Sequence, residues 1–405
     1  MAVGPATLPQ LHPVNGFRLG IASAGIKKPG RRDVVLMEMA EGSAVAGVFT
    51  LNAFCAAPVR VCKQHLAAAP ARYLLVNTGN ANAGTGEQGM VDAMACCQAV
   101  AERCEVPVEA VLPFSTGVIG EPLPVGKIVD VLGAAKTDLS EDNWESAAWG
   151  IMTTDTRPKA TSEQISYQGK IITLTGISKG SGMIMPNMAT MLGYVATDAE
   201  VPQALLQQWL SNVADRSFNR ITVDGDTSTN DSCMLVATGA SGVCIDGSDY
   251  ELAALFTEAL ERVMLNLAQA IVRDGEGATK FVEVCVESAG TSQEALDVAY
   301  TIAHSPLVKT ALFASDPNWG RILACVGRAG IDNLDLDALQ IYLNDVCIVE
   351  NGGRAASYTE EAGQAVMDGE EVLIRVVLNR GQVIERVWTT DLSHDYVSIN
   401  ADYRS

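Results

Sequence analysis

One glycine-rich segment holds the residues of this chain whose types and order best suit nucleophilic catalysis. It reads Lys179-Gly-Ser-Gly-Met-Ile-Met-Pro-Asn-Met-Ala-Thr190-Met-Leu-Gly193 and leads into an apolar run. The hydroxyl of Thr190 can attack the carbonyl carbon of Ala189, and cleavage of that peptide bond would leave Thr190 with a free α-amine. One residue would then supply both a nucleophile and its base. The segment therefore predicts a threonine nucleophile that the chain itself uncovers.

Such a site needs no histidine as its base. An α-amine has a reference pKa of about 7.7–8.0, so part of it is neutral near pH 7. The neutral amine can accept the proton of the hydroxyl as a general base. The chain has 4 histidines in all, and this small number is compatible with a base of another kind.

A second candidate for chemistry is the acidic loop Asp224-Gly-Asp-Thr-Ser-Thr-Asn-Asp231, which follows the apolar residues 221–223. It does not match an EF-hand, because Thr229 stands where glycine is needed and Leu235 where a bidentate glutamate is needed. The loop is also similar to the Asp-x-Asp loops of magnesium-dependent phosphotransferases. That interpretation stays open beside a simpler one, in which the short polar side chains bond their own backbone.

Two further segments offer groups that can bind a substrate or a transition state. Thr116 and Gly117 follow an apolar run, and a hydroxyl beside a backbone N–H can form an oxyanion hole. Glu276 lies in the charged segment Arg273-Asp-Gly-Glu-Gly-Ala-Thr-Lys280, where its carboxylate can orient a substrate ammonium. Each pattern is also typical of an ordinary turn, and spacing alone does not bring either one to Thr190.

Composition and charge exclude several classes of partner. The chain has 405 residues, of which 48% are hydrophobic and 19% charged, so it can bury a sizeable core. Its 28 basic and 48 acidic residues give a net charge of −20 at pH 7. This balance argues against nucleic acid and against an anionic membrane surface, since both need basic patches. A small anionic substrate, which needs only one or two local cations, stays compatible with it.

The N-terminal residues and the cysteines predict a soluble cytoplasmic protein without a metal site. The start Met1-Ala-Val-Gly-Pro-Ala-Thr-Leu-Pro9 lacks the basic and apolar regions of a signal peptide. No run approaches the roughly 20 apolar residues of a membrane span. The 10 cysteines include no Cys-x-x-Cys pair, so we expect no zinc site and regard them as small core residues in a reducing compartment.

The elements that must position these residues alternate between strands and helices. This order predicts an α/β or α+β fold with helices packed on β-sheets. By periodicity and β-branched content, strands are expected at 73–77, 110–115, 171–177, 191–195, 219–223 and 280–287. Helices are expected at 89–104, 125–132, 143–151, 202–213, 249–267 and 292–304. Thr116 would then end one strand, and the segment that holds Thr190 would join two others.

Taken in order, these motifs resemble the ornithine acetyltransferase family, the glutamate N-acetyltransferases of arginine biosynthesis. No position expected to carry catalysis departs from the family pattern. The similar blocks span nearly the whole chain and are Gly16-Phe-Arg-Leu-Gly20, Gly47-Val-Phe-Thr50, Asn77-Thr-Gly-Asn-Ala-Asn82, Ser115-Thr-Gly-Val-Ile-Gly120, Met152-Thr-Thr-Asp-Thr156, residues 179–193, 222–231 and 273–280, Asp316-Pro-Asn-Trp-Gly-Arg321 and Asn400-Ala-Asp-Tyr-Arg-Ser405.

The resemblance implies a self-cleaving fold with an N-terminal threonine nucleophile. Cleavage between Ala189 and Thr190 would give an α chain of residues 1–189 and a β chain of residues 190–405, assembled as two α and two β chains. Thr190 is implied as the nucleophile, and Thr116 and Gly117 as the oxyanion hole. The substrate-binding residues implied are Thr153 (with neighbouring Thr154 as its alternative), Lys179, Thr190, Glu276, Asn400 and Ser405.

The implied reaction moves acetyl from N²-acetylornithine to glutamate through an acetyl-Thr190 ester. The resemblance implies no cofactor and no metal, and it assigns the acidic loop at Asp224 a structural role. Whether acetyl-CoA also serves as an acetyl donor stays open, because members of the family divide on this point. An amide hydrolase or aminopeptidase of a related self-cleaving fold is the alternative, and it differs in passing the acyl group to water.

Overall fold

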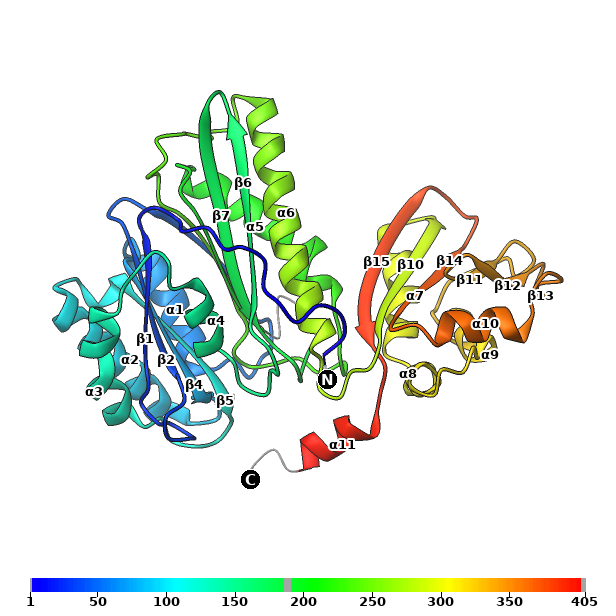
Figure 1. The fold of residues 1–405 in the computed structure, drawn as a ribbon, viewed down its shortest axis with the longest axis horizontal. Helices are drawn as coiled ribbons and strands as arrows, with labels where there is room; N and C mark the ends of the chain where they lie inside the picture. The colour runs from blue at the N-terminus through cyan, green and yellow to red at the C-terminus, as the bar shows by residue number, and fades with distance from the viewer. Residues whose placement is uncertain (1, 186–190, 402–405) are drawn as a thin grey trace. The chain divides into compact units, whose positions relative to one another are not determined.

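The computed structural model describes residues 2–185 and 191–401, which belong to two compact units (Figure 1). The larger unit comprises residues 7–219 and 226–271, and the smaller unit comprises residues 1–6, 220–225 and 272–405. This division differs from the predicted chains 1–189 and 190–405, because those are defined by a covalent cut and not by packing.

The larger unit contains a four-stranded sheet of β1 (Phe17–Ala22), β2 (Val34–Met39), β4 (Tyr73–Asn80) and β5 (Val111–Val118), in the order β1-β2-β4-β5. β4 and β5 are parallel, and the other pairs are antiparallel. Helices α1 (Ala57–Ala68), α2 (Gly86–Cys104), α3 (Val125–Thr137) and α4 (Trp144–Gly150) accompany this sheet (Figure 1). One face of it packs on apolar residues of α2 and α3.

A second sheet of the larger unit has five strands in the order β3-β9-β8-β7-β6. They are β3 (Ala44–Phe49), β6 (Lys159–Tyr167), β7 (Lys170–Lys179), β8 (Leu192–Thr197) and β9 (Ser232–Ala237). β8 is antiparallel to β7 and parallel to β9, with Lys179 opposite Leu192. Helices α5 (Gln203–Arg216) and α6 (Tyr250–Arg273) belong to the same part of the chain. The segment that holds Thr190 therefore joins two neighbouring strands.

The two sheets of the larger unit face each other across a shared apolar core. Phe114 of β5 and Tyr194 of β8 meet edge to face, with 5.3 Å between their ring centroids. Such a pair contributes about 0.5–1.5 kcal/mol beyond the area that it buries. Val76 and Met234 belong to the same buried cluster, one from each sheet. This packing fixes the ends of β5 and β7 relative to each other, and those ends carry two of the predicted site residues.

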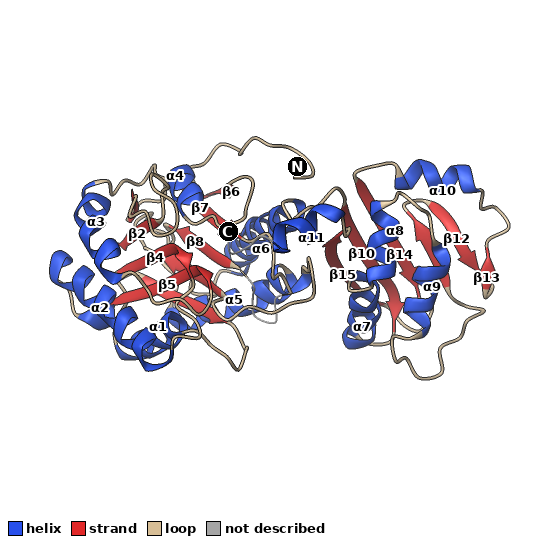
Figure 2. Ribbon diagram, turned by 90° about the horizontal axis from the view of Figure 1, so that it is seen from below, coloured by secondary structure: helices blue, strands red, loops and turns tan. Residues whose placement is uncertain are grey.

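The smaller unit is built on a six-stranded sheet in the order β13-β12-β11-β14-β10-β15 (Figure 2). Its strands are β10 (Phe281–Ala289), β11 (Gln340–Leu343), β12 (Val346–Glu350), β13 (Gly353–Arg354), β14 (Glu371–Val377) and β15 (Val383–Thr390). Its helices are α7 (Ser292–Ala303), α8 (Pro306–Phe313), α9 (Trp319–Gly327), α10 (Glu360–Met367) and α11 (His394–Ala401). Apolar residues of α7, α8 and α9 pack with those of the sheet in one core.

The observed architecture is mixed α/β with helices packed on sheets, so the predicted fold class is confirmed. The strand expected at 219–223 is wrong. Phe218–Arg220 forms a 3₁₀ helix, and Ile221 makes only an isolated bridge to Trp388. Ile221 and Val223 alternate as strand residues do, but the turn at Gly225, with φ of +82°, follows before a ladder can extend. Among the described residues, no helix is long and apolar enough to cross a membrane.

Candidate active site

The predicted oxyanion residues lie at the end of β5, beside the end of the parallel strand β4. Gly117 is opposite Gly79 in the register, and Thr116 is opposite Thr78. Gly117 has φ of +137°, and a Cβ atom there would lie 2.3 Å from the carbonyl carbon of Gly79. Only glycine fits this close approach of two backbones. The sequence Thr-Gly is therefore required by the strand pairing as well as by the chemistry predicted for it.

Lys179 connects the two sheets at this point. It ends β7, its side chain is buried, and its Nζ donates a hydrogen bond of 3.1 Å to Oγ1 of Thr116. An ammonium donates but does not accept hydrogen bonds. The Thr116 oxygen is thus the acceptor here, and its own hydroxyl hydrogen stays available for another acceptor. That arrangement suits a hydroxyl that must donate to an oxyanion.

Asp155 ties Thr153 to the strand end that carries Lys179. Its Oδ2 accepts from the backbone N–H of Thr153 at 2.9 Å, and its Oδ1 accepts from the N–H of Gly180 at 2.8 Å and from Nζ of Lys159 at 2.6 Å. Burial alone would raise the pKa of Asp155, but Lys159, Lys179 and these hydrogen bonds hold the pKa well below its usual value. The carboxylate stays ionised and positions both neighbours.

Asp231 is a buried carboxylate beside Lys179, and the sequence alone did not single it out. Its side chain is 2% exposed, and its Oδ2 has no hydrogen-bond partner among the described residues. Burial raises the pKa of Asp231 well above its usual value, while Ser228, the charge of Lys179 and the backbone N–H of Met191 oppose that rise. Met191 directly follows Thr190 in the chain. Asp231 is thus bonded to the residue next to the predicted nucleophile.

The rest of the acidic loop bonds to protein groups. Nδ2 of Asn230 donates to the carbonyl oxygens of Ala81 and Ser115, at 2.6 and 2.9 Å, and so holds the end of β5. In the smaller unit, Oδ2 of Asp224 accepts from the hydroxyl of Tyr396 at 3.2 Å. Within residues 2–185 and 191–401, no three His, Cys, Asp or Glu side chains converge as metal ligands would. These contacts favour the structural interpretation of the loop.

The smaller unit pairs two other predicted substrate-binding residues. Glu276 lies between α6 and β10 and is 6% exposed. Nδ2 of Asn400, in α11, donates a hydrogen bond of 2.7 Å to Oε2 of Glu276. An ionised carboxylate accepts several hydrogen bonds, so Glu276 can hold Asn400 and a ligand ammonium together.

The structure thus forms two groups of predicted site residues, one in each unit. The larger unit joins Thr116, Gly117, Lys179 and Thr153 through the contacts described above, and the smaller unit joins Glu276 and Asn400. Ala189, Thr190 and Ser405 lie outside the described residues. Their predicted roles, like the choice between Thr153 and Thr154, stay predictions.

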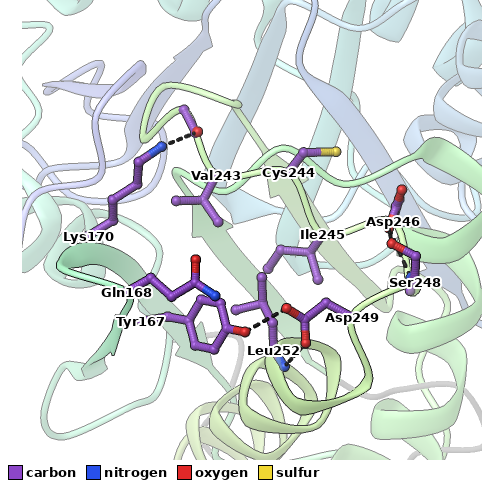
Figure 3. Close-up of a pocket in the computed structure, with 12 residues that line it drawn as sticks. Tyr167, Gln168, Lys170, Val243, Cys244, Ile245, Asp246, Ser248, Asp249 and Leu252 are labelled. Atoms are coloured by element: carbon purple, nitrogen blue, oxygen red, sulfur yellow. Dashed lines mark hydrogen bonds between the residues drawn. The ribbon is translucent and has the colours of Figure 1, made fainter.

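A separate cavity of the larger unit, about 330 Å³ in volume, has none of these residues in its lining (Figure 3). Several of its polar side chains are already paired. The hydroxyl of Tyr167 donates to Oδ2 of Asp249 at 2.5 Å, and Nζ of Lys170 donates to the carbonyl oxygen of Gly242 at 2.8 Å (Figure 3). This cavity offers no nucleophile beside a base, and we assign it no catalytic role.

Comparison with known proteins gives consistent matches. The model of the ArgJ family matches residues 18–405. The arginine biosynthesis bifunctional protein ArgJ of Pseudomonas fluorescens (strain Pf0-1) is 62% identical over 406 residues, with 100% of both chains covered. Among solved structures, ArgJ of Bacillus halodurans is 38% identical with a TM-score of 0.49, covering 51% of this chain and 97% of that one. Ornithine acetyltransferase of Mycobacterium tuberculosis, complexed with ornithine, is 33% identical with a TM-score of 0.39, covering 44% and 94%.

Proposed function

The chain belongs to the ArgJ family, and from this we propose that it is the acetyltransferase of arginine biosynthesis that moves acetyl from N²-acetylornithine to glutamate. The observation that carries the proposal is the contact of Lys179 with Thr116 beside Gly117, on a chain that matches its relative over its whole length. This contact supports an oxyanion site next to the segment in which the nucleophile is predicted.

The enzyme first activates itself by cutting its own chain. The Oγ of Thr190 attacks the carbonyl carbon of Ala189, a new C–O bond forms, and the peptide C–N bond breaks. The resulting ester is hydrolysed by water, which leaves a carboxylate on Ala189 and a free amine on Thr190. The products are the chains 1–189 and 190–405.

Acetyl transfer then proceeds in two half-reactions. The Thr190 hydroxyl loses its proton to the α-amine and attacks the acetyl carbon of acetylornithine. The amide C–N bond breaks, the leaving nitrogen takes up that proton, and ornithine departs from an acetyl-Thr190 ester. The neutral α-amine of glutamate attacks the ester, the C–O bond breaks, and the proton lost by glutamate returns to Thr190. The kinetics are therefore ping-pong.

The oxyanion of each tetrahedral intermediate is stabilised by two donors, the hydroxyl of Thr116 and the backbone N–H of Gly117. A preorganised donor of this kind is worth about 10²–10³ in rate. Lys179 accounts for the orientation of the Thr116 hydroxyl, since the ammonium occupies its oxygen as a donor. The same ammonium is available to the α-carboxylate that both substrates carry.

Glu276 is the proposed partner of the ornithine side-chain ammonium. Its carboxylate is buried and already holds Asn400, so it is fixed in place before a substrate arrives. A charge-assisted hydrogen bond between an ammonium and such a carboxylate is roughly twice as strong as a neutral one.

The proposal also covers the cofactor requirement, the cellular compartment and the oligomeric state of the enzyme. The reaction needs no metal and no organic cofactor, because the threonine, its amine and the oxyanion donors supply each step. We place the enzyme in the cytoplasm, and its 10 free cysteines support a reducing compartment. The assembly proposed is two α and two β chains, which native mass spectrometry would test.

The first test is the intact mass of the purified protein together with N-terminal sequencing. We expect two fragments in place of a single 42.8 kDa chain, one of them beginning Thr190-Met-Leu-Gly. Thr190→Ala should remain uncut and inactive, because alanine has no hydroxyl, whereas Thr190→Ser should still be cut. Two fragments and normal activity in Thr190→Ala would overturn the proposal.

A second assay separates transfer from hydrolysis. Release of ornithine from acetylornithine is measured with and without glutamate. We expect release to depend on glutamate and to yield N-acetylglutamate in equal amount. Release that ignores glutamate and yields acetate would identify the amide hydrolase instead.

A further inference from the structure

A second cavity of the larger unit has a volume of about 610 Å³. Its lining is richer in positive charge than that of the cavity beside Tyr167 and Asp249. Two arginines and an exposed tryptophan line it, together with three residues at or next to the candidate active site. The lining residues are Arg31, Arg32, Trp149, Met152, Thr153 and Asp155. No step of the proposed reaction of acetylornithine with glutamate uses the arginines or the tryptophan.

The arginines belong to a concentration of positive charge that is unusual in this chain. The loop between β1 and β2 reads Lys27-Lys-Pro-Gly-Arg-Arg32, with four cations in six residues. The whole chain has a net charge of −20, so most of its surface repels anions. A local group of cations beside a cavity focuses the field and attracts an anionic ligand.

Arg31 is anchored to the backbone of two other residues that line the cavity. Its Nη2 donates to the carbonyl oxygens of Met152 and Thr153, at 2.6 and 2.9 Å. A guanidinium has five N–H donors, so these two contacts fix the group and still leave donors for a ligand. The geometry is that of a prearranged anion-binding arginine placed beside Thr153.

Arg32 is exposed, and its side chain makes no hydrogen bond or ion pair with the residues that the structure describes. The one carboxylate in the lining does not neutralise it. Asp155 is committed to Lys159, 2.6 Å away, and to two backbone N–H groups. The positive charge of the two arginines is therefore available to a ligand.

Trp149 supplies an aromatic surface on the same cavity. It lies in α4, as Trp144 does, but the two indoles are used differently. Trp144 is 1% exposed and stacks on Phe17 with 5.2 Å between ring centroids, whereas Trp149 is 43% exposed. Exposed aromatic side chains beside cations are the usual platform for a nucleic-acid base, whose ring stacks while its phosphates meet the cations.

We propose that this cavity binds the phosphorylated nucleotide portion of acetyl-CoA, with the phosphates on Arg31 and Arg32 and the adenine on Trp149. This inference rests on the proposed acetyltransferase function. The lining is connected to the active site by hydrogen bonds. Asp155 accepts from Thr153 and from Gly180, and Lys179, which precedes Gly180, donates to Thr116. A donor held by its nucleotide would therefore direct its thioester toward the oxyanion residues.

The chemistry of this second donor balances without any added reagent. The Thr190 oxygen attacks the thioester carbon, a C–O bond forms and the C–S bond breaks. The proton taken from the hydroxyl by the α-amine passes to the departing sulfur, which leaves as the thiol of CoA. The acetyl-Thr190 ester is the same intermediate that acetylornithine gives, so glutamate is acetylated by the same second half-reaction.

The test compares three acetyl donors in the reaction with glutamate: acetyl-CoA, acetyl-pantetheine, which lacks the nucleotide, and acetylornithine. Arg32→Glu is expected to raise the KM for acetyl-CoA by about tenfold or more, because one charge-assisted contact is lost and the new carboxylate repels the phosphates. The kcat/KM for acetyl-pantetheine and for acetylornithine should stay within about twofold of the parent value. Arg216→Glu, at an arginine whose side chain is 68% exposed, is the matched control and should leave all three donors unchanged.

A direct binding measurement keeps this inference separate from the proposed function. Adenosine 3′,5′-bisphosphate, added to the full-length protein, should change its tryptophan fluorescence. Trp149→Phe should remove most of that change, and Arg32→Glu should weaken the binding about tenfold.

The outcomes distinguish the two ideas. Equal effects of Arg32→Glu on all three donors, or none on acetyl-CoA, would overturn the nucleotide site. Binding of adenosine 3′,5′-bisphosphate that both variants leave intact would also overturn it. Adenosine 5′-monophosphate binding as tightly as the bisphosphate would assign the cavity to a free nucleotide instead of CoA. A protein that transfers acetyl from no donor would refute the proposed function, and the fluorescence titration would still decide whether the nucleotide binds.

Discussion

Asp231 is a buried carboxyl group whose pKa burial raises well above its usual value, so the cations around it decide its charge. Its carboxylate is bonded to the N–H of Met191 and lies in the field of Lys179. Only two backbone carbons separate the nitrogen of Met191 from that of Thr190, so the amine freed by cleavage is the next nitrogen along the chain. An ammonium at that nitrogen would favour the ionised form of Asp231 against the effect of burial, and the ionised carboxylate would in turn raise the pKa of the amine.

Asp231→Asn should therefore shift the pH dependence of acetyl transfer. The neutral amide no longer favours the ammonium, so the pKa of the Thr190 amine should fall. Because the neutral amine is the base, the acidic limb of the kcat/KM profile should move to lower pH. The profile is measured with acetylornithine and glutamate on cleaved protein, and an acidic limb that stays in place would contradict this role.

The sequence predicts Thr116, Gly117, Thr153 and Lys179 as site residues, because each lies in a block whose order of residues is distinctive. Asp155 lay within such a block too, and Asp231 ended the acidic loop, yet neither was predicted as a residue of the active site. The chain has 48 acidic residues, and burial together with the nearby charge of Lys179 distinguishes these two. Burial of a carboxylate depends on contacts between distant segments, which residue types and spacing do not reveal.

Among the elements, α8 and β15 of the smaller unit are joined by a buried lysine. Lys309 is 4% exposed and its Nζ donates to Oγ1 of Thr389 at 3.0 Å and to the carbonyl oxygen of Thr390. Burial lowers the pKa of Lys309 to about 8, although Asp391 and Asp224 favour its charged form. The helix is thus held to the strand by a group that loses its charge in a mildly alkaline solution.

Lys309→Met should change how the stability of the protein depends on pH. In the unfolded chain the lysine keeps its proton up to a pH of about 10.4, whereas in the folded chain it releases the proton near pH 8. Between these values the unfolded state binds more protons, so Lys309 makes the free energy of unfolding rise with pH, by up to about 3 kcal/mol.

The measurement is urea unfolding of the parent and the variant at several pH values from 7 to about 10.5. Thiols and tyrosines titrate in the same range, so the useful quantity is the difference between the two proteins. We expect the parent to gain stability relative to Lys309→Met as the pH rises. A difference that is the same at every pH would show that Lys309 is not perturbed.

Elements with strong periodicity were predictable and the others were not. The expected helices at 89–104 and 249–267 correspond to α2 and α6, and the expected strands at 110–115 and 191–195 to β5 and β8. β1 and β3 were not predicted, because each has only six residues and includes a glycine that weakens the alternation of apolar and polar side chains. The order of the strands in each sheet depends on pairings between remote segments, for which a single sequence carries no direct signal.

For the molecule as a whole, the position of β8 in its sheet determines whether the two cleaved chains stay together. In the five-stranded sheet, β8 and β9 lie between β3 and β7. β8 and β9 come after the predicted cut in the chain, whereas β3 and β7 come before it. The predicted α and β chains therefore share one sheet and one core. Cleavage would break a single covalent link and leave these hydrogen bonds in place.

The cut chains should accordingly stay together under native conditions. We expect both fragments to elute as one species from a sizing column and to separate only in denaturant. In a chain of residues 190–405 expressed alone, β8 and β9 should not fold, because they would lose β3 and β7, the strands that flank them. Fragments that part in native buffer, or folded strands β8 and β9 in the isolated 190–405 fragment, would contradict this prediction.

The same strand order means that self-cleavage can occur only after the sheet has folded. Lys179 ends β7, Asp231 precedes β9, and the predicted scissile bond lies between β7 and β8. These groups meet only once the strands have paired, so a nascent or misfolded chain has no means of cutting itself. Each active molecule would then carry, in its free threonine amine, a permanent record that this sheet was correctly assembled before any substrate was touched.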